Sequence, residues 1–459
     1  MSNTKTSPSA TGRGFGAQGT GILILTFFSI LLMSNICYDS LNITIPSFAE
    51  FFAVSSGATG EALGAAIGGN FAKLYMFSTI AAWISVIGAG FWGALCGKTT
   101  CRLAWTVSLL VTAVGCFVWS TAANSNVYLI ALAIANIGGM GFAYIASLNV
   151  VSNWFPHKKA IAMGWVTIGF PLSAVIATPL CSALLGALSL DGIYKMYAVV
   201  CVVLAIAVWI FVRDYPEQKG AFPDNNVNFD KAAAEAELQA GLEYMKTSPW
   251  TVKKLMRTGT AWKMVFSLGV MELLSLGIMT NFVPRMEQIV YNGQVQYTDA
   301  EIIPMLAVAG IVACFGSVLC GILDTKVGPK KAIIITFIIA IISIVLNIIA
   351  GNVAAGGNKG LATIIFYCSL PFLAVMLGGA ANYLVSLTNT IWGRYDFPMA
   401  YRFIKPLVAI VGALGITICG VLGNATAGGY ALAYTVLGIL AAIGTIIMVT
   451  VDDTQVGRD

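Results

Sequence analysis

The segment Gly321-Ile-Leu-Asp-Thr-Lys-Val-Gly-Pro-Lys-Lys-Ala332 is a short polar loop between two long apolar runs, and it has a counterpart earlier in the chain. Residues 93–104 read Gly-Ala-Leu-Cys-Gly-Lys-Thr-Thr-Cys-Arg-Leu-Ala. Gly, Leu, Lys, a basic residue and Ala therefore recur at a constant spacing of 228 residues. Because the loops follow the second and the eighth apolar runs, they indicate that the chain consists of two related halves.

Two further pairs of segments repeat in the same order outside these loops. The fourth and tenth apolar runs each carry a Gly-Gly pair followed by Tyr and Ser, and the first and seventh each carry Asn shortly before Pro. Parallel repeats that surround a site at the membrane midplane are typical of a large class of transporters. The repeated residues are Gly138, Gly139, Tyr144 and Ser147 with Gly378, Gly379, Tyr383 and Ser386, and Asn42 and Pro46 with Asn281 and Pro284.

The composition requires an apolar solvent for most of the chain. Of the 459 residues, 58% are hydrophobic and 10% are charged, whereas a soluble domain has about 25% charged residues. A helix that crosses a membrane needs about 20 mostly apolar residues. We therefore predict an all-α membrane protein with twelve transmembrane helices in two pseudo-symmetric six-helix bundles. The predicted spans are 21–46, 71–95, 103–121, 126–150, 160–187, 192–212, 261–284, 301–322, 332–350, 361–389, 401–422 and 428–450.

The distribution of Lys and Arg predicts the orientation. With the N-terminus in the cytoplasm, 20 of the 25 basic residues fall in cytoplasmic segments, as the positive-inside rule expects. We predict a multi-pass protein of the plasma (inner) membrane with both termini in the cytoplasm. The expected units are a tail (1–19, without the features of a signal peptide), an N-terminal bundle (20–212), a cytoplasmic linker with a surface helix (213–260), a C-terminal bundle (261–450) and a tail (451–459).

Several functions are disfavoured by the same sequence. The basic residues are scattered between apolar runs, which argues against nucleic-acid binding. His157 is the only histidine, so neither a metal site nor a catalytic histidine with its partners is expected. Gly97-Lys98-Thr99 imitates the end of a phosphate-binding loop, but Trp92 stands where its first glycine belongs. We expect no cofactor, no disulfide framework and a monomer.

Four segments carry a closer resemblance. Together with the duplicated halves and the Gly-x-Leu-x-x-Lys loops, they make the chain resemble the major facilitator superfamily, and within it the oxalate:formate antiporter family. This resemblance implies alternating access around a central site, and small carboxylate substrates moved by exchange or with protons. The four segments are Asn153-Trp-Phe-Pro-His-Lys-Lys-Ala-Ile-Ala-Met-Gly164, Asp214-Tyr-Pro-Glu-Gln-Lys-Gly-Ala-Phe-Pro-Asp-Asn225, Gly321-Ile-Leu-Asp-Thr-Lys-Val-Gly328 and Trp392-Gly-Arg-Tyr-Asp-Phe397.

The sequence departs from the family pattern in two places. The first loop lacks the acidic residue and the glycine that the second loop keeps as Asp324 and Gly328. The oxalate carriers also pair an arginine of the eighth helix with a lysine of the eleventh, and residues 301–322 contain no Arg or Lys. A single lysine, Lys405 in the eleventh helix, fits a monocarboxylate better than a dicarboxylate.

A charge inside a predicted span costs about 2.5–3.5 kcal/mol on insertion scales, and three of the charged residues there are candidates for a function. Lys405 either attracts a substrate carboxylate or extends to the cytoplasmic surface. Glu272, near the middle of the seventh helix, is a candidate for proton coupling, a partner that neutralises Lys405, or a protonated core group. Asp39, in the first helix, either contacts the substrate or serves in gating or helix capping.

Uncharged polar residues complete the predicted site on helices one, four, seven and ten. Their alternative role is hydrogen bonding between helices, which is worth about 0.6 kcal/mol on average. These candidates are Tyr38, Asn42, Tyr144, Asn281, Asn382 and Tyr383, and the loops that we expect to control gating contribute Lys98, Arg102, Asp324, Lys326, Gly328 and Lys330.

The sequence thus predicts a secondary transporter of small organic anions, of the monocarboxylate kind, with protons or a counter-anion as the coupled species. One alternative is a transporter of cationic or neutral solutes in which Asp39 and Glu272 contact the substrate. Another is a membrane-embedded enzyme, which the absence of a catalytic cluster at one membrane depth disfavours.

Overall fold

A computed structural model describes residues 14–226, 231–425 and 429–457. Within some helices individual side chains also lie outside the described set, and the predicted site residue Asn42 is one of them. Residues 1–13 of the predicted N-terminal tail are outside it as well. All other predicted site residues belong to the described set.

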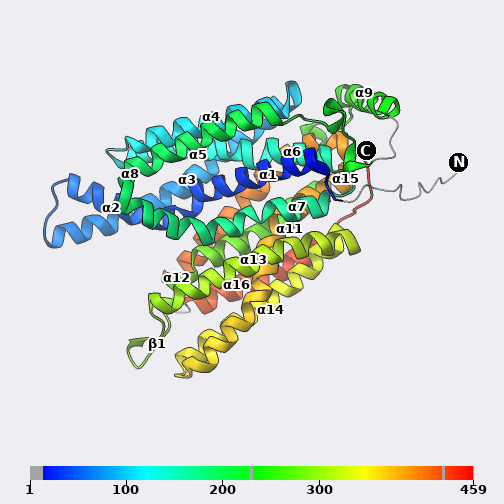
Figure 1. Cartoon of the computed structure of the whole chain (residues 1–459). Helices are drawn as coiled ribbons and strands as arrows, with labels where there is room; N and C mark the ends of the chain where they lie inside the picture. Colours follow the sequence, from blue (N-terminus) through cyan, green and yellow to red (C-terminus); the bar gives the residue numbers. More distant parts are fainter. Residues whose placement is uncertain (1–13, 227–230, 426–428, 458–459) are drawn as a thin grey trace.

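The N-terminal half consists of long apolar helices that run back and forth along one direction (Figure 1). Its first and fourth crossings each contain a short π-helical segment, in which an extra residue is accommodated within one turn. The elements are α1 (Gly16–Ser34), the π segment η1 (Asn35–Asp39), α2 (Leu41–Ser55), α3 (Glu61–Lys98), α4 (Cys101–Ser120), α5 (Ser125–Gly139), the π segment η2 (Met140–Ile145), α6 (Ala146–Trp154), α7 (Lys159–Thr167) and α8 (Gly169–Phe211).

A polar segment then leads to the C-terminal half, which has the same plan and one small β-hairpin. The segment contains η3 (Pro216–Lys219), η4 (Pro223–Asn225), α9 (Lys231–Thr247) and α10 (Val252–Met256). The C-terminal half contains α11 (Gly259–Thr280), α12 (Phe282–Glu287), the antiparallel strands β1 (Val290–Tyr291) and β2 (Gln294–Val295), α13 (Asp299–Val327), α14 (Pro329–Ala355), α15 (Lys359–Ala425) and α16 (Gly429–Val449).

The described residues contain ten helices that are long and apolar enough to cross a membrane. Two shorter apolar helices, Ile161–Ser173 and Lys359–Leu373, lie where the fifth and tenth spans are predicted. These twelve segments match the predicted fold of two six-helix bundles.

Single residues break the two longest helices into separate crossings. Ser189 in α8 has φ 59° and ψ 174°, and Gly393 in α15 has φ 68° and ψ −179°. The eleventh crossing therefore starts directly after Gly393, whereas the sequence predicts a start at 401. The polar residues Arg394 and Asp396 suggest a loop, but both are buried against the linker, which supplies their partners.

The two ends of the molecule differ in the elements that cover them. At one end, which we call the linker face, lie the start of α1, the α3–α4 turn and the linker helix α9; the β-hairpin lies at the opposite end, the hairpin face (Figure 1). Contacts between the halves close the linker face. Thr167 of α7 bonds to Ser317 of α13 at 2.5 Å, and Asn389 of α15 donates to Ser152 of α6.

Within the C-terminal half, α11 and the part of α15 after Gly393 approach each other at glycines. A Cβ atom on Gly415 would overlap the backbone oxygen of Leu273, and one on Gly277 would lie 2.8 Å from the oxygen of Gly415. Small residues are what allow helices to pack this closely in membranes. The same pair of helices carries two charged side chains, Glu272 next to Leu273 and Lys405 ten residues before Gly415.

Candidate functional site

An ion pair joins α11 to α15 inside the molecule. The Nζ atom of Lys405 lies 3.0 Å and 3.1 Å from the two carboxylate oxygens of Glu272, 133 residues away in sequence. Only 3% of the Lys405 side chain is exposed, so this lysine does not extend to the surface. The site therefore contains a cation and an anion that neutralise each other, with the cation almost completely buried.

The N-terminal half contributes an aromatic face to the same lysine. The Nζ atom of Lys405 lies 4.3 Å from the centre of the Tyr144 ring, within the range of a cation–π interaction. Tyr144 lies in η2 and its ring stacks on Phe170, with centroids 5.4 Å apart. Lys405 therefore contacts both halves of the protein, which is the position that a residue sensing their relative movement would occupy.

Glu272 is the more accessible member of the pair. Its side chain is 20% exposed, compared with 3% for Lys405. The side chains of Tyr38, Tyr144 and Tyr401 lie within electrostatic range of its carboxylate. A phenol hydroxyl is a group that can donate a hydrogen bond to a carboxylate.

The backbone shapes the space for Glu272 from the opposite helix. A Cβ atom on Gly412 of α15 would lie 2.8 Å from Cγ of Glu272. The glycine therefore provides the room into which the Glu272 side chain folds as it turns toward Lys405. A larger residue at position 412 would displace the carboxylate.

Asp39 has a local partner. It lies at the end of η1, and the hydroxyl of Ser34, five residues earlier, donates a 2.9 Å hydrogen bond to its Oδ2 atom. The π-helical turn brings these two residues to this distance. Tyr38, which precedes Asp39, is within electrostatic range of Glu272, so η1 borders the ion pair through Tyr38.

Other predicted site residues bond neighbouring helices within the C-terminal half. Asn281 donates to the backbone oxygen of Gly277 at 3.0 Å and accepts from Tyr430 at 3.3 Å. The Tyr383 hydroxyl lies 2.9 Å from that of Thr336 in α14. Asn382 is fully buried. The geometry places Tyr144, Glu272 and Lys405 together, with Tyr38 beside them, and does not place Asn281 or Tyr383 in that group.

The predicted gating residues lie at the linker face. Lys98 ends α3 and Lys326 lies in the last turn of α13, both exposed, and Gly328 follows with φ 83°. The guanidinium of Arg102 lies 4.3 Å from the Trp209 ring centre. Asp324 is 3% exposed, and Lys330 lies 3.7 Å from Asp453.

An aspartate from outside the first loop supplies the acidic group that this loop lacks. The carboxylate of Asp214 accepts hydrogen bonds from the backbone N–H groups of Cys101 (2.6 Å) and Arg102 (2.8 Å) at the start of α4. A carboxylate is favourable at this position because the first N–H groups of a helix have no partner within the helix. Burial raises the pKa of Asp214, and these backbone hydrogen bonds act in the opposite direction.

Three of the four segments that carry the family resemblance meet at the same face. Arg394 lies 3.3 Å from the carboxylate of Glu217 and donates to the backbone oxygen of Asn153 at 2.9 Å. Asn153 in turn donates to the backbone oxygen of Asp214 at 3.3 Å. Sequence patterns alone do not single out Arg394, Glu217 or Asp214 individually, although the quoted motifs contain all three. The motifs describe the contact between the linker and the two halves.

Comparison with known families decides the identity of the fold. The sequence pattern of the Major Facilitator Superfamily matches residues 22–396. The chain belongs to the major facilitator superfamily. Its membership establishes a multi-pass membrane protein of a family of small-molecule transporters, with Glu272 and Lys405 between its helices.

Solved structures of this superfamily share the fold over nearly the whole chain. The human organic anion transporter MFSD10 (TETRAN) covers 94% of this chain with 13% identity and a TM-score of 0.65, and all of its own chain is matched. The proton:xylose symporter XylE, bound to 6-bromo-6-deoxy-D-glucose, covers 95% of this chain and 97% of its own, with 15% identity and a TM-score of 0.67. At these identities the similarity concerns the fold alone.

Two curated relatives match short stretches of this chain. The oxalate:formate antiporter of Oxalobacter formigenes is 28% identical over 83 residues, which are 18% of this chain and 20% of the antiporter. The apicoplast pyruvate carrier 1 of Toxoplasma gondii is 42% identical over 60 residues, which are 13% of this chain and 11% of the carrier. The matched stretches thus span a fifth or less of either relative. Among the residues that the structure describes, no three His, Cys, Asp or Glu side chains are grouped as a metal site.

Proposed function

We propose that this major facilitator protein carries small organic anions with a single carboxylate across the plasma (inner) membrane. The observation that supports this most directly is the buried Lys405–Glu272 pair beneath Tyr144. A buried lysine whose counter-ion is a neighbouring carboxylate is suited to bind a substrate carboxylate in its place. The absence of Lys and Arg from residues 301–322 supports one anionic group per substrate.

Charge balance favours proton coupling at this site. An ion pair is neutral, and an unpaired charge in an apolar interior costs several kcal/mol. If a substrate carboxylate replaces Glu272 at Lys405, the site stays neutral when Glu272 takes up one proton. One proton and one monocarboxylate would then move together. Exchange of one anion for another uses the same lysine and leaves Glu272 protonated throughout.

The closed linker face corresponds to one end state of alternating access. We infer that this face is cytoplasmic, because the basic residues of the sequence gather in its loops. In this state the contacts of Arg394 with Glu217 and Asn153 close the cytoplasmic side. Substrate would then reach Lys405 from the external side, between the two bundles. Gating through Lys98, Arg102, Asp324, Lys326, Gly328 and Lys330 is part of this proposal.

The names of the two curated relatives support a carboxylate substrate. One is an antiporter of oxalate and formate and the other a pyruvate carrier. A cationic substrate is less well supported, because the carboxylate of Glu272 already has Lys405 as its partner and Asp39 accepts from Ser34. Uptake of organic cations by the wild type would nevertheless favour that alternative.

The test is uptake of labelled pyruvate, formate and oxalate into vesicles that contain the purified protein. Lys405→Ala is expected to lose uptake by tenfold or more, because the substrate carboxylate loses its cation. Glu272→Gln is expected to retain binding but to lose stimulation by an inward proton gradient. Lys246→Ala, which removes an exposed cation of the linker helix, is the matched control. Unchanged anion uptake by Lys405→Ala would reject the role of this lysine.

A further inference from the structure

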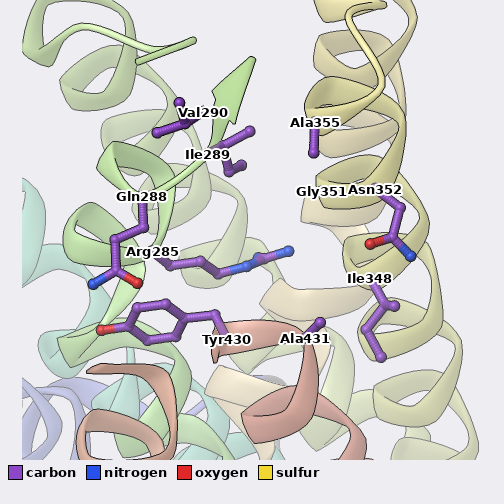
Figure 2. Close-up of a pocket in the computed structure, with 10 residues that line it drawn as sticks. All are labelled: Arg285, Gln288, Ile289, Val290, Ile348, Gly351, Asn352, Ala355, Tyr430 and Ala431. Atoms are coloured by element: carbon purple, nitrogen blue, oxygen red, sulfur yellow. The ribbon is translucent and has the colours of Figure 1, made fainter. Parts of the chain in front are cut away.

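A cavity of about 310 Å³ lies within the C-terminal half near the hairpin face, well apart from Lys405. Its walls come from α12 and the hairpin, from α14, and from the start of α16 (Figure 2). Arg285 lines it and lies thirteen residues after Glu272, which corresponds to about 20 Å along a helix. All of its lining residues belong to the C-terminal half, so it is not the space between the two bundles.

Arg285 is a buried cation whose partners in the structure are neutral. It is 5% exposed. Its Nη1 atom donates to Oδ1 of Asn347 at 2.7 Å, its Nη2 atom donates to the backbone oxygen of the same residue, and its guanidinium lies 4.0 Å from the Tyr434 ring centre. No ion pair among the described side chains includes Arg285. Because a buried charge is costly unless an opposite charge compensates it, this arginine is suited to an anion from outside the chain.

The side chain is directed at the cavity. Figure 2 shows it extending from α12 toward α14, with Asn352 on the facing helix and Tyr430 beside it. A Cβ atom on Gly351 would lie 3.7 Å from Nη2 of Arg285. The glycine therefore leaves space on the α14 surface opposite the guanidinium. A guanidinium offers five N–H groups in a planar fork that matches carboxylate and phosphate oxygens.

The equivalent region of the N-terminal half is packed without such a site. By the 228-residue spacing of the repeat, Asn347 corresponds to Trp119. Trp119 stacks on Tyr194 with ring centres 4.3 Å apart, and Phe48 packs against Tyr194 at 5.9 Å. This region of the N-terminal half is thus filled by aromatic rings, whereas the C-terminal half has Arg285, Asn347 and an open cavity. Packing of the fold at this place does not require a cation.

We propose that the Arg285 cavity is a second anion site, which binds one compact oxyanion group such as a phosphate. Arg285 holds the anion from α12, and Asn352 of α14 is placed to donate an amide N–H to it. The anion is either a free ion from the aqueous side or the headgroup of an anionic phospholipid at the membrane surface. In both cases it ties α12, α14 and α16 together at the hairpin face.

Two measurements on the detergent-purified full chain test the site and separate the two sources of the anion. The first is the thermal unfolding temperature in sodium phosphate and in sodium chloride at equal ionic strength. The second is native mass spectrometry with phosphatidylglycerol and, for comparison, phosphatidylcholine. Stabilisation by phosphate identifies a free anion, and selective retention of phosphatidylglycerol identifies a lipid headgroup. Either result in the wild type, lost in Arg285→Gln, supports the proposal.

The variants are chosen so that a folding defect cannot imitate the result. Arg285→Gln is expected to weaken anion binding about ten- to a hundredfold, the range of a lost charged hydrogen bond. Asn352→Leu keeps the buried arginine but blocks the cavity, and it is expected to weaken binding as well. Lys195→Gln, which removes an exposed cation elsewhere, and Lys405→Ala are expected to leave this binding unchanged. The proposal is overturned if the wild type binds neither anion more tightly than Arg285→Gln, or if Asn352→Leu binds as the wild type does.

Discussion

Arg394, the first residue of the eleventh crossing, forms a buried ion pair with Glu217 of the linker, with 3.3 Å between Nη2 and Oε1. The same guanidinium donates to the backbone oxygen of Asn153 at the end of α6. One arginine therefore joins the C-terminal half, the linker and the N-terminal half at the linker face. Opening of this face has to break these contacts.

Removal of Glu217 is expected to loosen the linker face. Glu217→Gln leaves the buried guanidinium of Arg394 without its counter-charge, which costs about 3–5 kcal/mol when one partner of a buried pair is lost. We expect a lower unfolding temperature and faster alkylation of a cysteine placed at Asn389. Glu243→Gln, an exposed carboxylate of the same linker, is the control. Equal labelling rates in the wild type and Glu217→Gln would show that this pair does not hold the face closed.

Substitution of Gly415 is expected to separate the helices that carry the site. A Cβ atom at this position would overlap a backbone oxygen of α11, so Gly415→Ala forces the two helices apart and stretches the Lys405–Glu272 pair. Gly90→Ala in α3 meets no atom within 4 Å and is expected to stabilise its helix by about 0.5–1 kcal/mol. Thermal unfolding and carboxylate uptake measured on both variants check this contrast. Normal uptake by Gly415→Ala would contradict it.

The contribution of Tyr144 is expected to come from its ring face. Tyr144→Phe keeps the ring over Lys405, and we expect the apparent affinity for a carboxylate to stay within about threefold of the wild type. Tyr144→Leu removes a cation–π interaction of about 0.5–2 kcal/mol, so affinity should fall by about two- to thirtyfold. Concentration dependence of uptake gives both values. A larger loss in the Phe variant than in the Leu variant would instead assign the effect to the hydroxyl.

The pH dependence of stability should include a contribution from Asp214. Burial raises its pKa above the unfolded value, so the folded state holds the proton more tightly and this group favours folding more as the pH falls toward the unfolded pKa. Asp214→Asn cannot titrate. The unfolding temperature of the wild type relative to Asp214→Asn is therefore expected to increase as the pH falls from 7 to 4. A constant difference would show that the two backbone hydrogen bonds balance burial, and a difference in the opposite direction would show that they outweigh it.

Much of the fold could be predicted from apolar runs and repeats, because a membrane restricts the chain to helices of a fixed length. The start of the eleventh helix could not be placed correctly, because a hydropathy pattern assigns the charged residues Arg394 and Asp396 to a loop. Their partners lie in the linker, which is distant in sequence. The same reason limits how well the site can be predicted from the sequence. The sequence singled out Lys405 and Glu272 because buried charges are costly, but their pairing depends on how two helices pack. Arg285 lies one residue beyond the predicted span 261–284, so hydropathy does not distinguish it from a loop cation.

The π-helical segment η2 marks a difference between the two halves of the repeat. The spacing between the repeats is 240 residues at Gly138 and Gly378, but 239 at Tyr144 and Tyr383. One extra residue thus lies between these points in the N-terminal half, and the bulge Met140–Ile145 holds it. A π-helical turn accommodates an extra residue locally, so the helix continues on either side of it. Tyr383 bonds to Thr336 within its own half, whereas Tyr144 faces Lys405 in the other. Equivalent tyrosines of the two halves therefore differ in their partners, and the one that contacts the opposite half is the one that lies in the bulge.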